Sequence, residues 1–336
     1  MVASVGPTAP IRPTPDPCEP LSELRRACRT NVRFIRDSPT PTFSGASSPL
    51  ARGAAAMAES NAPRPDYDYL FAATAGRSGA RRLAAALATC EGVHATHECD
   101  PVMDGRIMRW ALTDQFPADF LAQRYVMSIR SSREALRCRV RADISKVFNR
   151  WYGTHVVRAL DPRRCLVVRL RRPPLELIRD LVMDGSIPGE GWGGHWMGDP
   201  RWSGWHLRFE PRDEVEAVAW HVMESMVRSE ELTKECPGLR VADLDLETIA
   251  DAESLAHWLR GVGLRPGREL EARLGSVPVG SDVAPRSFEC DDSAISEAWS
   301  RVVATAASQG VIGEASAARI AAGHADFGSG RRPHVA

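Results

Sequence analysis

Short apolar runs and amphipathic segments alternate along residues 68–265 of the chain. The first apolar run, 69–73, ends at Gly76-Arg-Ser-Gly79, and an alanine- and leucine-rich segment of high helix propensity follows it. A second apolar run, 164–170, ends at Arg171-Arg-Pro-Pro174 and leads into another helical segment. Each unit predicts a buried strand, a turn and a helix. This alternation predicts an α/β fold whose mostly parallel central sheet is flanked by helices.

Other segments extend this scheme. The further predicted elements are a strand over 93–96, mainly helix over 103–160, an amphipathic helix over 213–236, a strand over 239–245 and helices over 253–260 and 293–308. Residues 185–212 form a long predicted loop with several tryptophans among glycines. Loops of this length are commonly lids or binding loops, and the alternative is that the tryptophans anchor an irregular connection to the core.

The composition changes along the 336 residues and suggests three regions. Residues 1–65 are rich in Pro, Ser, Thr, Ala and Arg without sustained periodicity. We expect this segment to be disordered, or to be a mis-assigned extension with Met57 as the true start, so that residues 1–56 are not translated. Residues 66–275 are predicted to form the α/β domain, and residues 276–336 a C-terminal helix and a flexible tail.

Charge and cysteine content restrict the function classes. The formal net charge is zero, which argues against a nucleic-acid partner. Eight scattered cysteines without a C-x-x-C pair fit a reducing compartment and offer no structural zinc spacing, so no metal requirement is expected. No apolar run approaches the roughly 20 residues that span a bilayer, and no secretory pattern opens the chain. We therefore expect a soluble, cytoplasmic protein.

The turn Gly76-Arg-Ser-Gly79 is the first candidate binding element. A tight glycine turn before a helix directs backbone N–H groups and the positive end of the helix dipole to one point, which suits a phosphate-like anion. Arg77, Arg81 and Arg82 add positive charge. The alternative is an ordinary strand-to-helix corner whose glycines only permit the turn. A polar cluster over 94–100 follows the next predicted strand, at the kind of sheet edge where open α/β sheets bind their ligands.

Three segments in this order resemble the sulfotransferase family. They are 71–83 with its glycine turn, the strand and Arg-x-Pro segment 167–180, and the long helix, Pro-Gly turn and strand over 220–245. Residues 143–148, Asp-Ile-Ser-Lys-Val-Phe, are similar to a further family element. The resemblance covers residues 68–265. It implies a P-loop NTPase-like three-layer sandwich and the nucleotide donor PAPS (3′-phosphoadenosine 5′-phosphosulfate).

The resemblance also assigns roles to individual positions. It implies that the donor is bound by Gly76, Arg77, Ser78, Gly79, Ala80, Arg81, Arg172 and Asp180. Arg77 matches the basic residue that stabilises charge on the leaving nucleotide, so it is also a predicted catalytic residue. Arg172 matches the arginine that binds the 3′-phosphate.

Two positions depart from the family pattern. Ala80 stands where the family has a threonine whose hydroxyl contacts the 5′-phosphate, and we expect the charge of Arg81 to compensate for the missing hydroxyl. Asp180 stands where a serine is expected, and its carboxylate should repel a 3′-phosphate. Either Asp180 pairs with Arg172, or Arg179 binds the phosphate as a substitute ligand. A shift of the proline register would instead align Arg171 and Arg179 with the phosphate.

Sulfuryl transfer needs in-line positioning, charge neutralisation and a base for the acceptor. The candidate bases are Glu98, His97 and His94, with Glu98 preferred, and Ser145 and Lys146 are candidates for lining the cleft. The sequence thus predicts a PAPS-dependent enzyme that acts on a hydroxyl or amine of a small molecule or glycan. The alternatives are a catalytically impaired binding protein of the same fold and, less favoured, a P-loop nucleotide kinase, which lacks its Gly-Lys-[Ser/Thr] here.

Overall fold

The computed structural model describes residues 65–99, 101, 103–278 and 291–321. The N-terminal unit, Met1–Asn61, lies outside this part of the chain, and so do the predictions of a disordered or mis-assigned extension. The predicted flexible tail falls beyond it from residue 322 onward.

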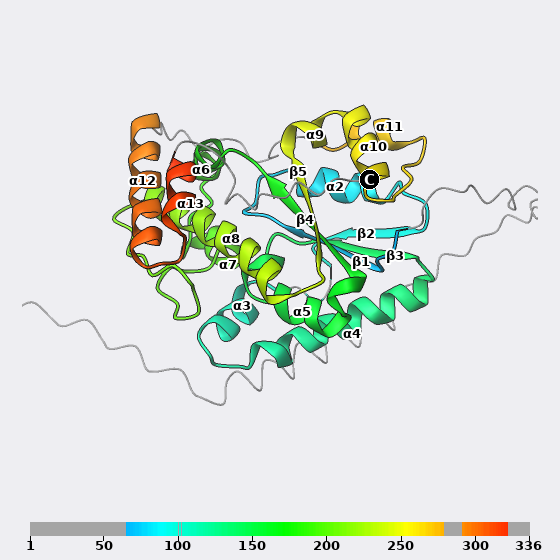
Figure 1. Ribbon diagram of the computed structural model, residues 1–336, viewed down its shortest axis with the longest axis horizontal. Helices are drawn as coiled ribbons and strands as arrows, with labels where there is room; N and C mark the ends of the chain where they lie inside the picture. The colour runs from blue at the N-terminus through cyan, green and yellow to red at the C-terminus, as the bar shows by residue number, and fades with distance from the viewer. Residues whose placement is uncertain (1–64, 100, 102, 279–290, 322–336) are drawn as a thin grey trace, which may run out of the picture. The chain divides into compact units, whose positions relative to one another are not determined.

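Five strands form one parallel sheet at the centre of the domain (Figure 1). They are β1 (Tyr69–Ala73), β2 (Val93–His97), β3 (Val140–Ile144), β4 (Cys165–Arg171) and β5 (Arg240–Asp245), in the spatial order β2-β3-β1-β4-β5. The predicted parallel α/β sheet is therefore confirmed. In β1, Leu70 and Ala72 point to one face and Tyr69 and Phe71 to the other, and all are buried because helices cover both faces.

Helices cover both faces of the sheet and complete a three-layer sandwich. On one face lie α2 (Ala80–Leu87), α9 (Leu246–Ala250), α10 (Ala252–Gly261) and α11 (Leu270–Gly275). On the other lie α3 (Gly105–Leu112), α4 (Ala118–Leu136), α5 (Gly153–Leu160), α6 (Pro174–Met183), α7 (Gly191–Trp196) and α8 (Glu214–Glu235). Two 3-10 turns, η2 (Phe148–Arg150) and η3 (Pro162–Arg164), flank α5. Among the described residues, no helix combines the length and the apolar character that crossing a bilayer requires.

Strand β3 differs from the sequence prediction, which made 103–160 mainly helical. The strand carries Arg141 and Asp143, and these charges interrupt the apolar pattern that identified the other strands. Both side chains are nonetheless buried because they have internal partners. Arg141 donates to Ser132 Oγ at 3.0 Å and to Thr96 Oγ1 at 3.0 Å, and Asp143 accepts from Thr96 Oγ1 at 3.1 Å.

The tryptophan-rich segment is packed into the core. It contains the short helix α7, which its glycine content concealed from the sequence pattern. Trp196 and Trp205 are each only 4% exposed, and Trp205 stacks on Trp202 and meets the edge of Trp220. These contacts favour the interpretation that the tryptophans anchor an irregular connection to the core. They do not support an open lid.

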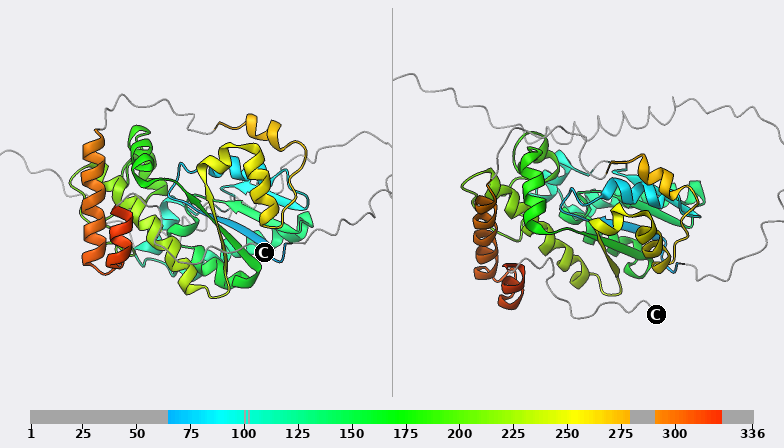
Figure 2. Two further views of the ribbon diagram at one scale, coloured as in Figure 1. Left: turned by 45° about the horizontal axis from the view of Figure 1, so that its top comes forward. Right: turned by 90° about the horizontal axis from the view of Figure 1, so that it is seen from above.

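The predicted C-terminal helix is present as α12 (Asp292–Ser308), followed by α13 (Glu314–Ala321). Both lie side by side at one end of the domain in orange and red, and α12 packs against α6 and α8 (Figure 2). Its buried side chains include Ile295, Trp299 and Val302. This helix therefore adds a further layer to the core formed by α6 and α8.

Strands β1 and β4 are neighbours whose connections leave toward opposite faces of the sheet. The chain runs from β1 into α2 on one face and from β4 into α6 on the other. Diverging connections leave a crevice at the carboxyl ends of the two strands, where open α/β sheets place their ligands. The turns at 74–79 and 171–173 thus lie beside each other at this edge.

Candidate functional site

Backbone conformation shapes the turn between β1 and α2. Gly76 and Gly79 have φ angles of +95° and +83°, a region that favours glycine. A Cβ atom at Gly76 would lie 2.6 Å from Trp196 Cη2, so that glycine also permits close packing of the indole. The turn delivers the chain to Ala80, the first residue of α2, whose first-turn N–H groups have no acceptor within the helix.

A cavity of about 300 Å³ opens at this edge of the sheet. Its described lining is Gly76, Arg77, Gly79, Ala80, Arg81, Arg82, His97, Glu98, Lys146, Arg172, Asp180, Asp184, Ser186, Trp196, Leu246 and Pro278. The fold thus brings nearly all of the predicted site residues together. The exceptions are Ser78, His94 and Ser145, none of which lines the cavity. Ser78 and Ser145 are buried, and the Ser78 hydroxyl donates to the Gly76 carbonyl at 2.7 Å.

Two aspartates of one helical turn pair with the two key arginines. Arg172 Nη1 lies 2.6 Å from Asp180 Oδ2 and also donates to the Arg77 carbonyl at 3.1 Å. The Arg77 guanidinium contacts Asp184, which follows α6 and accepts a hydrogen bond from Ser186 Oγ at 2.6 Å. The cavity arginines are therefore held in place by carboxylates. Of the alternatives left open by the sequence, the pairing of Asp180 with Arg172 is the one observed.

The other basic residues of the Arg-x-Pro segment have partners elsewhere. Arg179 lies 2.5 Å from Asp292 of α12 and does not line the cavity. Arg171 Nε donates to Asp243 Oδ1 of β5 at 2.7 Å. Arg172 is thus the arginine of this segment that lines the cavity, whereas Arg171 and Arg179, the pair of the shifted register, do not line it.

The end of β2 supplies a second polar group. Glu98 Oε1 lies 3.1 Å from Lys146 Nζ, and Lys146 stands 5.2 Å from the centre of the Trp196 ring. Burial, and then the charges of Lys146 and Arg81, lowers the pKa of His97 even though Glu98 opposes the shift. His97 is therefore neutral near pH 7 and can accept a proton. Burial also raises the pKa of nearby Asp104.

Two of the cavity residues have strained backbone conformations. Arg77 has a φ of +49° and Glu98 a φ of +57°, both in the left-handed region that non-glycine residues rarely occupy. Such strain persists where the surrounding structure imposes it and concentrates at functional sites. The two strained residues lie at the ends of β1 and β2 and line the same cavity, which supports its role as the functional site.

A buried polar network lies behind the turn. Arg150 is buried and contacts His221 Nδ1 at 3.1 Å and the Thr74 carbonyl at 3.5 Å, while His221 Nε2 lies 3.1 Å from the Ala75 carbonyl. Burial lowers the pKa of Arg150 to about 9, so its charge persists at pH 7. Sequence reasoning missed both residues, because Arg150 follows a strand that was not predicted and His221 lies within a long helix.

Arg82 has a structural role that differs from the expected contribution of charge to the turn. Its guanidinium donates to four backbone carbonyls, those of Ile249, Ala250, Leu274 and Val277. These bonds join α2 to α9, to α11 and to the segment that follows α11. The donors of Arg82 are consequently used within the fold.

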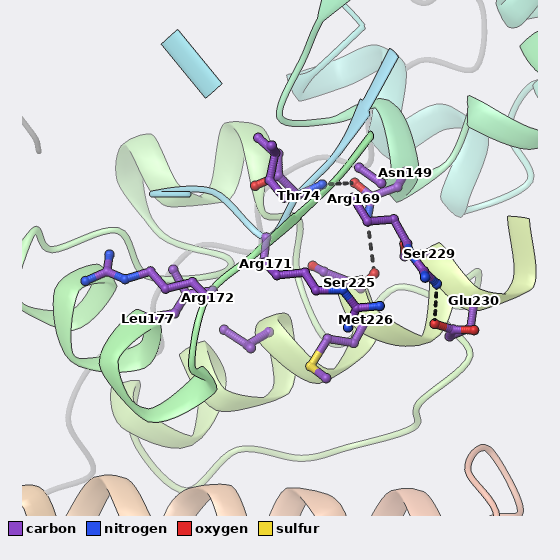
Figure 3. A pocket seen from close by; sticks show the side chains of 14 residues that line it. Thr74, Asn149, Arg169, Arg171, Arg172, Leu177, Ser225, Met226, Ser229 and Glu230 are labelled. Carbon is purple, nitrogen blue, oxygen red and sulfur yellow. Dashed lines mark hydrogen bonds and ion pairs between the residues drawn. The ribbon is translucent and has the colours of Figure 1, made fainter. Parts of the chain in front are cut away.

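A second, smaller cavity of about 70 Å³ lies on the side of the turn that faces α8 (Figure 3). Asn149 accepts from the Thr74 N–H at 3.3 Å and donates to the Ser225 carbonyl at 3.0 Å, as the dashed lines show. Arg169 pairs with Glu230 at 2.6 Å and with Asp243 at 2.7 Å. Its charge is therefore compensated, and this space serves the packing of the turn rather than anion binding.

The comparisons with known proteins assign no family. No protein-family model matches the chain, and no curated protein matches its sequence. Among the side chains that the structure describes, no group of three or more His, Cys, Asp or Glu residues could hold a metal ion. The residues of the cavity are therefore the features from which function is inferred.

Proposed function

We propose that this protein is a sulfotransferase that moves a sulfuryl group from a PAPS-type nucleotide donor to a hydroxyl or amine of a small molecule or glycan. The observation that carries the proposal is the joint lining of one cavity by the glycine turn with Arg77, by Arg172 after β4 and by His97 and Glu98 after β2. This arrangement provides an anion-binding end and a proton-accepting end at the carboxyl edge of the sheet.

The donor end has the features that a 5′-phosphosulfate requires. Arg77 and Arg81 line the cavity beside the first turn of α2, whose N–H groups and dipole favour an anion. Ala80 supplies a backbone N–H but no hydroxyl, so backbone and arginine contacts replace it. Arg150 adds a buried positive charge behind the turn. The residues at this end therefore fit the phosphosulfate part of the donor.

The acceptor end supplies the proton transfer. In the proposed step, Glu98 or neutral His97 takes the proton from the acceptor hydroxyl or amine as that atom bonds to sulfur. The bond between sulfur and the bridging oxygen breaks, and the bridging oxygen leaves with its electron pair on the nucleotide phosphate. Arg77 stabilises the negative charge that develops there. Lys146, held 3.1 Å from Glu98, orients the carboxylate and adds positive charge to the cavity.

The test combines binding and product detection on the full chain. Calorimetric titration with adenosine 5′-phosphate and with adenosine 3′,5′-bisphosphate is expected to show binding of at least one nucleotide. Incubation with the matching phosphosulfates and a mixture of sugars, phenols and amines is expected to give a sulfated product by mass spectrometry. The absence of binding of both nucleotides at millimolar concentration would refute the proposal.

The catalytically impaired alternative gives a different result in the same experiment. This alternative is favoured by the missing hydroxyl at Ala80 and by the ion pairs that carboxylates already form with Arg77 and Arg172. That protein would bind a nucleotide yet produce no sulfated product from any phosphosulfate. Magnesium-dependent turnover of ATP would instead favour the P-loop kinase.

A further inference from the structure

We propose that Asp180 makes the cavity select a nucleotide whose ribose carries a free 3′-hydroxyl, so that the donor is a nucleoside 5′-phosphosulfate without a 3′-phosphate. This inference rests on the proposed function and refines its donor. It follows from the partners of Arg172, from the charge of the cavity lining and from the chemistry by which carboxylates bind ribose.

Arg172 is already paired on the side that faces α6. Its Nη1 lies 2.6 Å from Asp180 Oδ2, and its Nε lies 3.9 Å from Glu176 Oε2. The Arg172 side chain is 13% exposed, while those of Asp180 and Glu176 are 44% and 53% exposed. Asp180 lines the cavity and Glu176 does not, so a ligand at this end reaches the Asp180 carboxylate more readily than the Arg172 guanidinium.

Beyond Arg172, the two neighbouring arginines Arg179 and Arg77 are paired with carboxylates other than Asp180. Arg179, the neighbour of Asp180, is engaged by Asp292 at 2.5 Å. Arg77 is engaged by Asp184. A 3′-phosphate placed beside Asp180 would meet a like charge, and juxtaposed like charges oppose binding.

The charge of the cavity lining matches the 5′ end of a donor alone. Five arginine and lysine side chains and three carboxylates line the cavity, which leaves a formal charge of +2. A 5′-phosphosulfate carries two negative charges and would neutralise this lining. A 3′-phosphate adds about two further negative charges at pH 7, which would remain uncompensated.

A carboxylate is the usual partner of an unphosphorylated ribose. In dinucleotide-binding folds an acidic side chain accepts hydrogen bonds from a ribose hydroxyl, whereas an arginine accommodates a phosphate on the same ring. Asp180 offers two acceptor oxygens, and the ion pair with Arg172 at 2.6 Å holds one of them in place. The other can accept the hydrogen bond of a 3′-hydroxyl.

The decisive experiment compares two nucleotides that differ only in the 3′-phosphate. Adenosine 5′-phosphate and adenosine 3′,5′-bisphosphate are titrated into the full-length wild type and into Asp180→Ser, which removes the carboxylate. Wild type is expected to bind the monophosphate at least about tenfold more tightly than the bisphosphate, and Asp180→Ser to reverse this preference. Asp119→Ser removes an exposed carboxylate of α4 outside the cavity and should leave the wild-type ratio unchanged.

Each outcome separates the donor preference from the proposed function. If wild type binds the bisphosphate more tightly and Asp180→Ser keeps the same ratio, the selection by Asp180 is wrong while the sulfotransferase proposal stands. If neither nucleotide binds to wild type or to Asp180→Ser, the proposed function fails and the inference fails with it. Circular dichroism checks the fold of each variant, and Asp180→Asn, which removes the charge but keeps the shape, provides a second measurement of the ratio.

Discussion

Arg77 is the side chain on which the proposed transfer depends most directly. It lines the cavity from the strained turn, where its φ is +49°, and its guanidinium is held by Asp184. We expect Arg77→Ala to lower the rate of sulfuryl transfer by about 10²–10³, the loss typical of removing a donor to a developing oxyanion. The measurement is the rate of formation of sulfated product at saturating donor, with the fold checked by circular dichroism.

Arg179→Ala is the matched control for this variant. Arg179 belongs to the neighbouring helix α6, pairs with Asp292 at 2.5 Å and lies outside the cavity lining. Its loss should change the transfer rate less than about twofold, because the side chain does not reach the cavity and exposed ion pairs contribute little to the stability of the fold. Equal losses for Arg77→Ala and Arg179→Ala would contradict the catalytic role of Arg77.

Gly76 links the turn to the indole that borders the cavity. An alanine there would adopt a φ near +95° and place its Cβ 2.6 Å from Trp196 Cη2. We expect Gly76→Ala to reduce the free energy of unfolding by about 2–3 kcal/mol, from backbone strain and the displaced indole together. Urea unfolding at equilibrium measures this loss.

Gly261→Ala serves as the comparison for Gly76→Ala. Gly261 ends α10 and has an ordinary negative φ, and outside its own helical turn the Cβ atom of an alanine there would meet no atom within 4 Å. Alanine at this position should stabilise the protein by about 0.4–1 kcal/mol through the unfolded chain. Similar effects of the two substitutions would mean that Trp196 does not restrict position 76.

Among the secondary-structure elements, the sequence identified those with continuous apolar patterns. Strands β1 and β4 were predicted because their apolar runs end at glycine or proline turns. Strand β3 was missed because Arg141 and Asp143 interrupt the pattern, and their partners, such as Thr96, come from another strand. Long-range partners of buried charges leave no local signal, so the period of the pattern could not reveal this strand.

In the candidate site, too, the sequence identified residues that follow predicted strands and missed residues that meet only through long-range packing. Arg77, Glu98 and Arg172 each follow a predicted strand, so the parallel sheet alone indicated that they meet at one edge. Arg150 and His221 are 71 positions apart and join only through the packing of α8 behind the turn. No spacing rule connects such positions, which explains why this network emerged from the structure alone.

The contact between α8 and the turn predicts a pH dependence of stability. His221 Nδ1 faces the Arg150 guanidinium at 3.1 Å and its Nε2 faces the Ala75 carbonyl, so the neutral ring fits and a second proton does not. Burial, and then Arg150, lowers the pKa of His221 well below its usual 6.5. Below about pH 6.5 the unfolded chain therefore binds a proton at His221 that the folded chain does not bind. The free energy of unfolding consequently falls with decreasing pH, by up to about 1.4 kcal/mol per pH unit.

His221→Gln isolates this contribution. Glutamine retains a donor and an acceptor but does not titrate, and the other histidines remain in both proteins. We expect the variant to be less stable than wild type at about pH 7.5 and the difference to shrink toward about pH 5. Urea unfolding across this range gives the two curves, and curves that stay parallel would exclude His221 as the titrating group.

Across the described protein, the packing of α12 predicts that the C-terminal helix unfolds together with the α/β sheet. Trp299 of α12 is 3% exposed in the core shared with α8, and Arg301 pairs with the buried carboxylate of Glu216. Trp299→Ala should lower the free energy of unfolding by about 3–5 kcal/mol, as expected for truncating a buried tryptophan. Calorimetry should show a single transition at a lower temperature, because loss of the indole weakens the core rather than one detached helix.

Phe120→Ala provides the contrasting case for this prediction. Phe120 of α4 is 53% exposed, so its truncation should change stability by less than about 0.5 kcal/mol. Nucleotide binding should be retained by both variants at temperatures where they are folded, since neither residue lines the cavity. A separate low-temperature transition in Trp299→Ala, with the main transition unmoved, would instead mean that α12 and the sheet are independent folding units. The single transition is expected because α12 contacts both α6, which carries Asp180, and α8, which carries His221.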